Sequence, residues 1–386
     1  MPPIWPARRR RSVQSAISIA LGIAFGILLI TRGFPFLLVN SLLAGLLLSV
    51  AVHETGHVVG CAIARYRHRT FTVWPLQFNR ETGKWRLGWA GGHGIGSGFI
   101  TVDADEDSDF VRRMSIVVAA GPAASLVTGI LAASWTSNAL RYSSIVHSIA
   151  IWSLLLGAVS LIPGSHGSVV NDGSRLRMFW RGGPEAARFR SLVILSTSSE
   201  RGLPPREWNP VLMEQLPGPF DGTPDSGVAL MFRFNWLLDR GQIDEAGAVL
   251  WTIGGLDLTD QCRATWWLEA AWFEARYRKD AIAAHSWMDS VPNHYKSRVE
   301  QCSVHKAEAA IALLEERWDD FAAALGQALH ACEAIADLGI ANATREDLYK
   351  LEAEACQLKP AASSARISQE EIENEGRSPS GDLRIS

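Results

Sequence analysis

The sequence has almost no excess of charge of either sign and no closely spaced cysteine pair. Its 386 residues carry 37 Lys and Arg against 40 Asp and Glu, a formal net charge of −3. So small a charge gives no argument for nucleic acid or an acidic substrate as partner, and we predict no nucleic-acid binding. The five cysteines include no CxxC pair. This argues against a zinc knuckle or a disulfide framework and favours reduced thiols in a reducing compartment.

Long apolar runs are missing from the second half of the chain and crowd into residues 12–163. We predict four membrane-spanning helices, because a hydrocarbon core of about 30 Å needs about 20 apolar residues. They are residues 13–31, 36–63, 114–134 and 145–162. A basic start followed by an apolar run is also typical of a signal peptide, but the first run is longer than a usual signal core. No small-residue cleavage site follows it, so we expect a retained helix.

Basic residues flank these spans unevenly. They gather before the first span, between the second and third, and after the fourth, whereas the other side carries only Arg32 and Arg141. By the positive-inside rule, both termini and the long loop between the second and third spans are cytoplasmic. We therefore expect a multi-pass integral protein of the lipid bilayer, in a bacterial inner membrane.

The loop between the second and third spans has the composition of strands. Residues 70–102 contain FTVWPLQF and KWRLGWA, joined by NRETG, and then the glycine-rich stretch GGHGIGSGFITV. Short, aromatic and partly alternating segments around a turn predict a small β-hairpin insert. Such backbone either lies at the cytoplasmic interface or lines a cavity, or it forms an ordinary cytoplasmic hairpin.

Ionisable residues interrupt the second span. The segment HETGH places His53, Glu54 and His57 in an HExxH pattern. Positions i and i+4 share one helix face, so both imidazoles can bind one ion while Glu54 projects about 100° around the helix. Charged groups at membrane depth are costly and usually functional. The pattern predicts a catalytic zinc with Glu54 as the base for its water; the alternative is two histidines bonded to neighbouring helices without metal. Gly56 and Gly60 form a GxxxG pair typical of close helix packing.

The third ligand has to come from the cytoplasmic side. His57 lies about six residues, or ~9 Å, from the cytoplasmic end of its span. The fourth span returns to that side and ends in SLIPGSHGSVVNDGSRL, which brings Asp172. Asp172 is therefore the predicted third ligand. His93 and His166, both in glycine-rich stretches, are the alternatives for the third ligand or for polarising the scissile carbonyl.

Together these motifs resemble the site-2 protease family of intramembrane zinc metalloproteases. The likeness covers residues 36–176 and rests on HETGH, the Gly-Pro pair of AAGPAASLVTG, the strand-like insert, and Asp-Gly after a proline-containing helix end. The resemblance implies that His53, His57 and Asp172 bind zinc and that Glu54 is the catalytic base. The implied activity is endopeptidase cleavage of membrane-anchored proteins near the cytoplasmic face.

The insert has an implied role in holding substrate. A peptide must leave its helix to be cut, and strand addition to a free sheet edge would hold it extended. Our candidate edge is GFITV, residues 98–102, and the alternative is a glycine-rich linker without substrate contact.

Three positions depart from the family pattern. Asn171 replaces the leucine of Leu-Asp-Gly, Ser125 takes the asparagine place of Gly-Pro-x-x-Asn, and Ser160 stands where asparagine precedes Leu-x-Pro. These departures motivate a second hypothesis, a catalytically silent relative whose membrane domain anchors a helical partner-binding domain. Four spans and one compact site give little support to a metal transporter.

The second half of the chain has a different composition. We expect residues 1–183 to form a four-span metalloprotease core with a small β-hairpin insert, followed by a soluble all-α helical-hairpin domain. Residues 184–225, with PPREWNP and LPGPFDGTPDSG, predict a linker. Residues 226–358 repeat helix pairs at roughly 35–40 residues, which predicts a tetratricopeptide-like array. Such an array presents a groove for a cytoplasmic partner, or the helices form an irregular bundle. Residues 359–386 are polar and predicted disordered.

Overall fold

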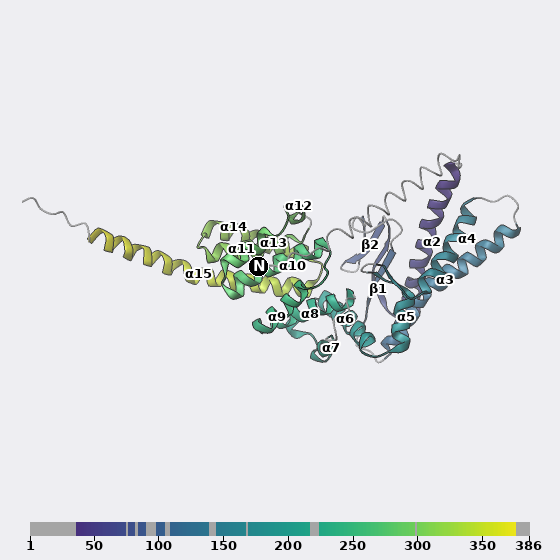
Figure 1. The fold of residues 1–386 in the computed structure, drawn as a ribbon, viewed down its shortest axis with the longest axis horizontal. Helices are drawn as coiled ribbons and strands as arrows, with labels where there is room; N and C mark the ends of the chain where they lie inside the picture. Colours follow the sequence, from purple (N-terminus) through teal and green to yellow (C-terminus); the bar gives the residue numbers. More distant parts are fainter. Residues whose placement is uncertain are drawn as a thin grey trace, which may run out of the picture. The chain divides into compact units, whose positions relative to one another are not determined.

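The chain divides into two units, Met1–Gly182 and Gly183–Ser386. The computed structural model describes residues 36–74, 76–81, 84–89, 98–104, 109–138, 144–166, 169–216, 224–297 and 299–375 (Figure 1). The boundary lies within one residue of the one predicted. Gly182 and Gly183 have φ of 66° and 82°, a left-handed backbone that glycine adopts without the steric cost of a Cβ.

The first unit is built on three apolar helices, α2 (Phe36–Ile63), α3 (Phe110–Asn138) and α4 (Ser144–Leu161). They coincide with three of the four predicted spans, and the fourth, residues 13–31, lies outside the described residues. Within the described part of the chain, α2 and α3 are long and apolar enough to cross a membrane, as judged by length and composition. The apolar part of α4, Ile145–Leu161, is shorter.

Small residues let these helices approach closely. A Cβ added to Gly56 would lie 2.6 Å from the Ala120 carbonyl oxygen, and one added to Gly60 would lie 2.7 Å from the Ala120 Cβ. The GxxxG pair therefore packs α2 against α3, as predicted. Between α2 and α4, the buried Ser153 hydroxyl donates to the Ser49 hydroxyl at 2.9 Å.

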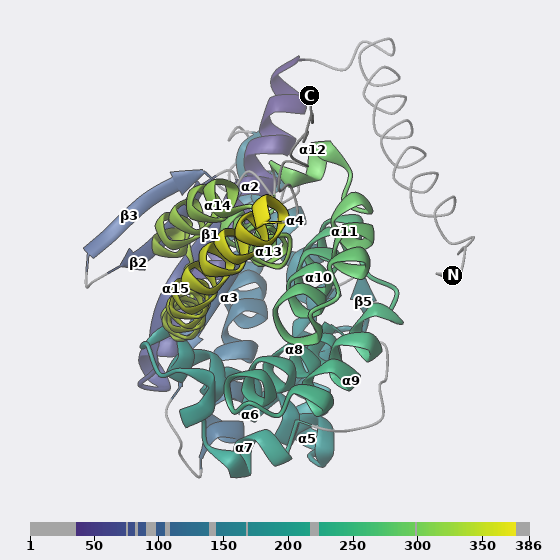
Figure 2. The same cartoon turned by 90° about the vertical axis from the view of Figure 1, so that its left-hand side faces the viewer.

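The insert is larger than the predicted hairpin at residues 70–102. It is a four-stranded antiparallel sheet of β1 (Arg67–Val73), β2 (Leu76–Glu81), β3 (Lys84–Trp89) and β4 (Gly98–Asp103), in the order β3-β2-β1-β4. Figure 2 shows β2 and β3 side by side. The predicted first strand, FTVWPLQF, is divided between the end of β1 and the start of β2, and the second, KWRLGWA, corresponds to β3. The prediction misses that β1 pairs with β4, far along the chain. The candidate edge GFITV is an edge strand, because β4 ends the order of the described strands.

One face of this sheet is apolar and open. Residues directly opposite in an antiparallel pair share a face, and the register joins apolar partners across all four strands: Leu76 with Trp89, Phe78 with Leu87, Phe71 with Phe78, and Phe71 with Ile100. On β3, Leu87 is 64% and Trp89 69% exposed. The opposite face carries Gln77, Asn79 and Arg86. The sheet therefore suits an apolar environment on the face of Leu87 and Trp89 and a polar environment on the opposite face.

The second unit is helical within the residues described. Its elements are α6 (Pro184–Glu200), η1 (Pro205–Glu207), α7 (Pro210–Glu214), α8 (Pro224–Asp239), α9 (Ile243–Gly254), α10 (Asp260–Phe273), η2 (Glu274–Arg278), α11 (Ala281–Asp289), α12 (Asn293–Lys296), α13 (Gln301–Leu314), α14 (Trp318–Ala331), η3 (Cys332–Ala334) and α15 (Leu338–Glu375). The pairs α8 and α9, α10 and α11, and α13 and α14 pack as successive hairpins. This agrees with the helical-hairpin pattern expected for residues 226–358.

Much of the predicted linker, residues 184–225, is folded instead. Ile194, Leu195 and Trp208 are fully buried. Prolines begin α6, η1, α7 and α8. Proline suits the first turn of a helix, where its missing N–H would have no partner anyway. The proline-rich composition therefore marks helix starts, and the linker prediction is wrong for residues 184–214.

Helix α15 packs against α6, α13 and α14. Its Leu348 and Leu351 are buried in the core, and its Asp347 and Glu354 bind the Arg276 guanidinium at 3.3 and 2.5 Å. A cavity of about 240 Å³ remains between α15 and helices α8, α10 and α13. The helix extends to Glu375, beyond residue 358, and residues 376–386 lie outside the described part.

Candidate metal centre

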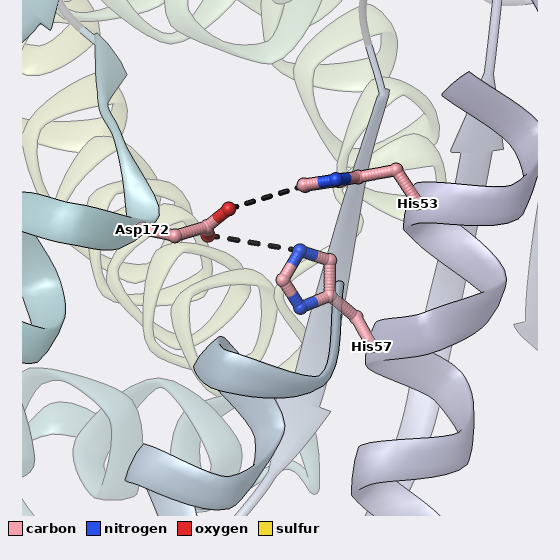
Figure 3. Close-up of side chains that lie close together, drawn as sticks. All are labelled: His53, His57 and Asp172. Carbon is pink, nitrogen blue, oxygen red and sulfur yellow. Dashed lines mark hydrogen bonds and ion pairs between the residues drawn. The ribbon is translucent and has the colours of Figure 1, made fainter. Parts of the chain in front are cut away.

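Three side chains from distant parts of the sequence meet in the first unit. His53 and His57 project from α2, and Asp172 begins α5 (Asp172–Arg181) (Figure 3). The Asp172 Oδ2 lies 3.1 Å from the His53 Nε2, and the Oδ1 lies 3.6 Å from the His57 Nε2. The three ligand atoms lie within 4.8 Å of one another. The sequence prediction that these residues converge is confirmed.

The spacing of these atoms suits a small tetrahedral ion. Zinc bonds to nitrogen and oxygen of about 2.0–2.2 Å place neighbouring ligands of a tetrahedral site about 3.4 Å apart. The two imidazole-to-carboxylate distances, 3.1 and 3.6 Å, lie on either side of that value. Three protein ligands leave a fourth position for water, as in catalytic zinc sites.

The outer nitrogens of both imidazoles are held by α3. The Val117 carbonyl, which can only accept, lies 2.8 Å from the His57 Nδ1. That nitrogen therefore carries the proton, and the His57 Nε2 presents its lone pair toward Asp172. The His53 Nδ1 lies 3.0 Å from the fully buried Ser125 hydroxyl. Metal-binding histidines are oriented by such hydrogen bonds on the second ring nitrogen. The donor set thus fits a zinc ion.

Gly121 makes room for one of the ligands. A Cβ at this position of α3 would overlap the His57 ring, including its Nε2. The glycine of the Gly-Pro pair is therefore required by the close approach of the imidazole to the α3 backbone. Any side chain here would push the His57 ring out of its position beside Asp172.

A network of hydrogen bonds fixes the start of α5. Asn171 is the N-cap: its Oδ1 accepts from the Ser174 N–H at 3.1 Å and from the Gly164 N–H at 3.2 Å. Its Nδ2 donates to the Ile162 carbonyl at 2.6 Å. An asparagine N-cap satisfies amides that the first helical turn leaves without partners. Asn171, a departure from the family pattern, thereby ties the start of α5 to the end of α4 and orients Asp172.

Gly173 completes this junction. A Cβ on Gly173 would overlap the carbonyl of Leu161, the last residue of α4. The Asp-Gly pair is therefore explained sterically: the aspartate is a ligand, and the glycine lets the first turn of α5 touch α4. Asp172 is also the acidic residue of the first turn of α5, where the helix dipole favours a negative charge.

Glu54 is the fourth predicted site residue. It follows His53 on α2 and is 6% exposed, so its carboxylate is nearly as enclosed as the two imidazoles. It does not belong to the group of three that could hold an ion. Its place next to a ligand on the same helix suits a base that acts on a molecule in the open position.

The sequence offers His93 and His166 as alternative third ligands. His93 lies outside the described residues, and His166 is described only as a backbone position of β5 (Ser165–His166), paired with Val169 in β6 (Val169–Val170). Within the described residues, His53, His57 and Asp172 are the one group of three or more such side chains close enough to hold a metal ion.

Sequence reasoning missed the residues that orient the ligands. Ser125 and Asn171 were noted only as departures from the family pattern. Asn171 had a readable signal, since an asparagine directly after the β-like pair Val169–Val170 and three residues before Ser174 is a helix N-cap pattern. The role of the Val117 carbonyl had no sequence signal, because every residue has a main-chain carbonyl and the sequence does not show which one will contact a histidine.

Comparison with known proteins adds no relative. The chain matches no protein-family description, no curated protein and no solved structure.

Proposed function

We propose that the chain is an intramembrane zinc endopeptidase that hydrolyses peptide bonds of membrane-anchored proteins near the cytoplasmic face. The observation that carries this proposal is the meeting of His53, His57 and Asp172, with the outer nitrogen of each imidazole held by α3. A purely structural pair of histidines would not need a carboxylate opposite both Nε2 atoms.

Each residue of the site has its own role in the proposed hydrolysis. Zinc bound at this site would act as a Lewis acid toward a water molecule and the scissile carbonyl. Glu54 takes the proton from the attacking water and delivers it to the nitrogen of the leaving amine, so the peptide bond is replaced by a carboxyl group and an amine. Asp172 and the two histidines hold the site, and the burial of the two histidines limits the access of bulk water to it.

A bilayer around α2, α3 and α4 is part of the proposal. Large apolar side chains project outward from these helices: Val59 on α2, Ile130, Leu131 and Trp135 on α3, and Ile151 on α4 are all more than half exposed. Water would penalise such a surface, whereas lipid would not. We place the apolar face of the sheet at the cytoplasmic interface, where Trp85 and Trp89 suit the headgroup boundary.

Basic residues mark the cytoplasmic end. The Arg113 Nε donates to the Ala64 carbonyl at 2.7 Å, and its guanidinium lies 4.0 Å from the centre of the Tyr66 ring. Arg113 thereby joins the end of α2 to the start of α3 at the level of the headgroups. We propose a multi-pass topology with this end of the helices, and both termini, in the cytoplasm of a bacterium.

The substrate enters as an extended chain. The edge strand β4 is bonded to β1 along one side, and no other described strand pairs with its other side in the order β3-β2-β1-β4. Main-chain hydrogen bonds to β4 would hold an unwound substrate segment whatever its amino-acid sequence. Pockets for the substrate side chains would therefore set the specificity.

The test is a comparison of two variants of α2. Glu54→Gln should keep the zinc content of the wild type, abolish cleavage and accumulate an uncut, membrane-anchored protein that co-purifies with it. Thr55→Ala is the matched control, because Thr55 is exposed on the next position of the helix and bonds only to the Ala51 carbonyl among the described residues. Cleavage by the Glu54→Gln variant would reject the proposal, and loss of cleavage in both variants would show that α2 itself is disturbed.

A further inference from the structure

Two buried thiols touch each other in the second unit. The Sγ atoms of Cys302 and Cys332 are 2.8 Å apart, and the residues are 1% and 0% exposed. Both are free cysteines, as are Cys61, which is buried, and Cys262 and Cys356, which are exposed. Thirty residues separate the pair in the sequence, so the hairpin of α13 and α14 brings them together.

The pair closes the open end of that hairpin. Cys302 is the second residue of α13, and Cys332 directly follows α14 as the first residue of η3. An S–S bond is about 2.05 Å long, so a shift of less than about 1 Å separates the two thiols from bonding distance. The hairpin of α13 and α14 already holds the two thiols at this distance.

The neighbouring Cys302 thiol and the Lys306 ammonium favour the thiolate form of Cys332. The hydrogen bond from the Cys302 thiol lowers the pKa of Cys332 below its ordinary value; burial opposes this shift, and the Lys306 ammonium adds to it. Lys306 lies one helical turn after Cys302 and binds the Glu269 carboxylate at 2.8 Å. The thiolate is the nucleophile in disulfide exchange, so Cys332 is the residue that attacks first.

Both cysteines can be reached by opening of helix ends. Their neighbours Glu300, Gln301 and Glu333 are exposed. The end turns of helices open at a small fraction of the cost of global unfolding. The dense core around the pair therefore limits the rate of reaction without preventing it.

We propose that Cys302 and Cys332 are a modification site that a small-molecule disulfide oxidises to an intramolecular disulfide. The Cys332 thiolate attacks one sulfur of the reagent and releases one thiolate, leaving a mixed disulfide. Cys302 then gives up its proton to solvent, and its sulfur attacks the Cys332 sulfur and releases the second thiolate. Two protein thiols lose their protons and two electrons in total, and the reagent is reduced to two thiols.

The bond would tie α13 to the segment that leads into α15. It closes a loop that contains the whole of α14, and such a loop restricts the unfolded chain. Helix α15 begins at Leu338, six residues after Cys332, and packs against α13 and α14. The oxidised protein should therefore unfold at a higher temperature than the reduced protein.

The test counts thiols in the purified full-length chain. After incubation with oxidised glutathione, the protein is unfolded, alkylated and digested without reductant. We expect a linked peptide pair containing Cys302 and Cys332, the loss of both from the alkylated set, and glutathione adducts on the exposed Cys262 and Cys356. A rise in the unfolding midpoint should accompany the link and disappear on reduction.

Single variants supply the controls. Cys302→Ser and Cys332→Ser should each lose the link and the oxidation-dependent rise in midpoint, and their far-ultraviolet circular dichroism should match that of the wild type. The proposal is overturned if both cysteines remain alkylatable while Cys262 and Cys356 carry adducts. Separate glutathione adducts on Cys302 and Cys332 without a link would overturn it equally. If a serine variant misfolds, the wild-type peptide map decides alone.

Discussion

The hydrogen bond between Ser125 and His53 offers a graded test of the metal centre. Ser125→Ala removes the hydroxyl that lies 3.0 Å from the His53 Nδ1 and leaves a space smaller than a water molecule's share of volume in a fully buried position. The imidazole keeps its zinc-facing nitrogen but loses the partner that orients its ring. Loss of such a partner lowers metal affinity by roughly 10–100-fold, or about 1.4–2.7 kcal/mol.

The assay is a zinc titration in competition with a chelator, on detergent-purified protein. The matched control is Ser115→Ala on the same helix, because the Ser115 hydroxyl donates to the Val111 carbonyl one turn away. We expect the Ser115 variant to bind zinc as the wild type does and the Ser125 variant to bind it more weakly by the factor above. Equal affinities in the two variants would refute the orienting role of Ser125.

Two further predictions concern α5 and α15. Gly173→Ala should displace Asp172 and lower zinc occupancy, because its Cβ would overlap the Leu161 carbonyl; Gly164→Ala, whose Cβ would have its nearest neighbour at 3.8 Å, should keep the metal in the same measurement. In the second unit, the hydrogen bond from Arg206 lowers the pKa of Glu346 below its ordinary 4.5. A lowered folded-state pKa means that the stabilisation by Glu346 is present above pH 4.5 and lost as the pH falls through the folded-state pKa. Glu346→Gln should therefore lower the unfolding midpoint at neutral pH and leave it nearly unchanged in acid, whereas an equal loss at both values would count against this ion pair.

The helices of the first unit could be read from the sequence because their signal is local. The range Phe36–Ile63 is free of charged residues except Glu54, and it is one helix at the predicted bounds. The sheet could be read only in part, because the pairing of β1 with β4 joins segments that no local pattern connects. The hairpin of β2 and β3 was visible because its turn lies between its strands.

The ligands could be predicted from chemistry, but their supports could not. HExxH spacing and chain direction were enough to bring Asp172 to His53 and His57. The roles of Ser125 and of the Val117 carbonyl depend on how α3 packs on α2, which tertiary contacts decide. In the second unit, the proline-rich composition of residues 184–225 predicts a linker, but proline is also common in the first turn of a helix, so composition alone does not separate the two.

The most direct test of the metal centre is the zinc content of the purified protein. Elemental analysis should find one zinc per chain in the wild type and in Thr55→Ala, and close to none in His57→Ala and Asp172→Ala. A wild-type chain that neither carries zinc nor takes it up from solution would contradict the account, and so would an Asp172→Ala variant that keeps a full equivalent.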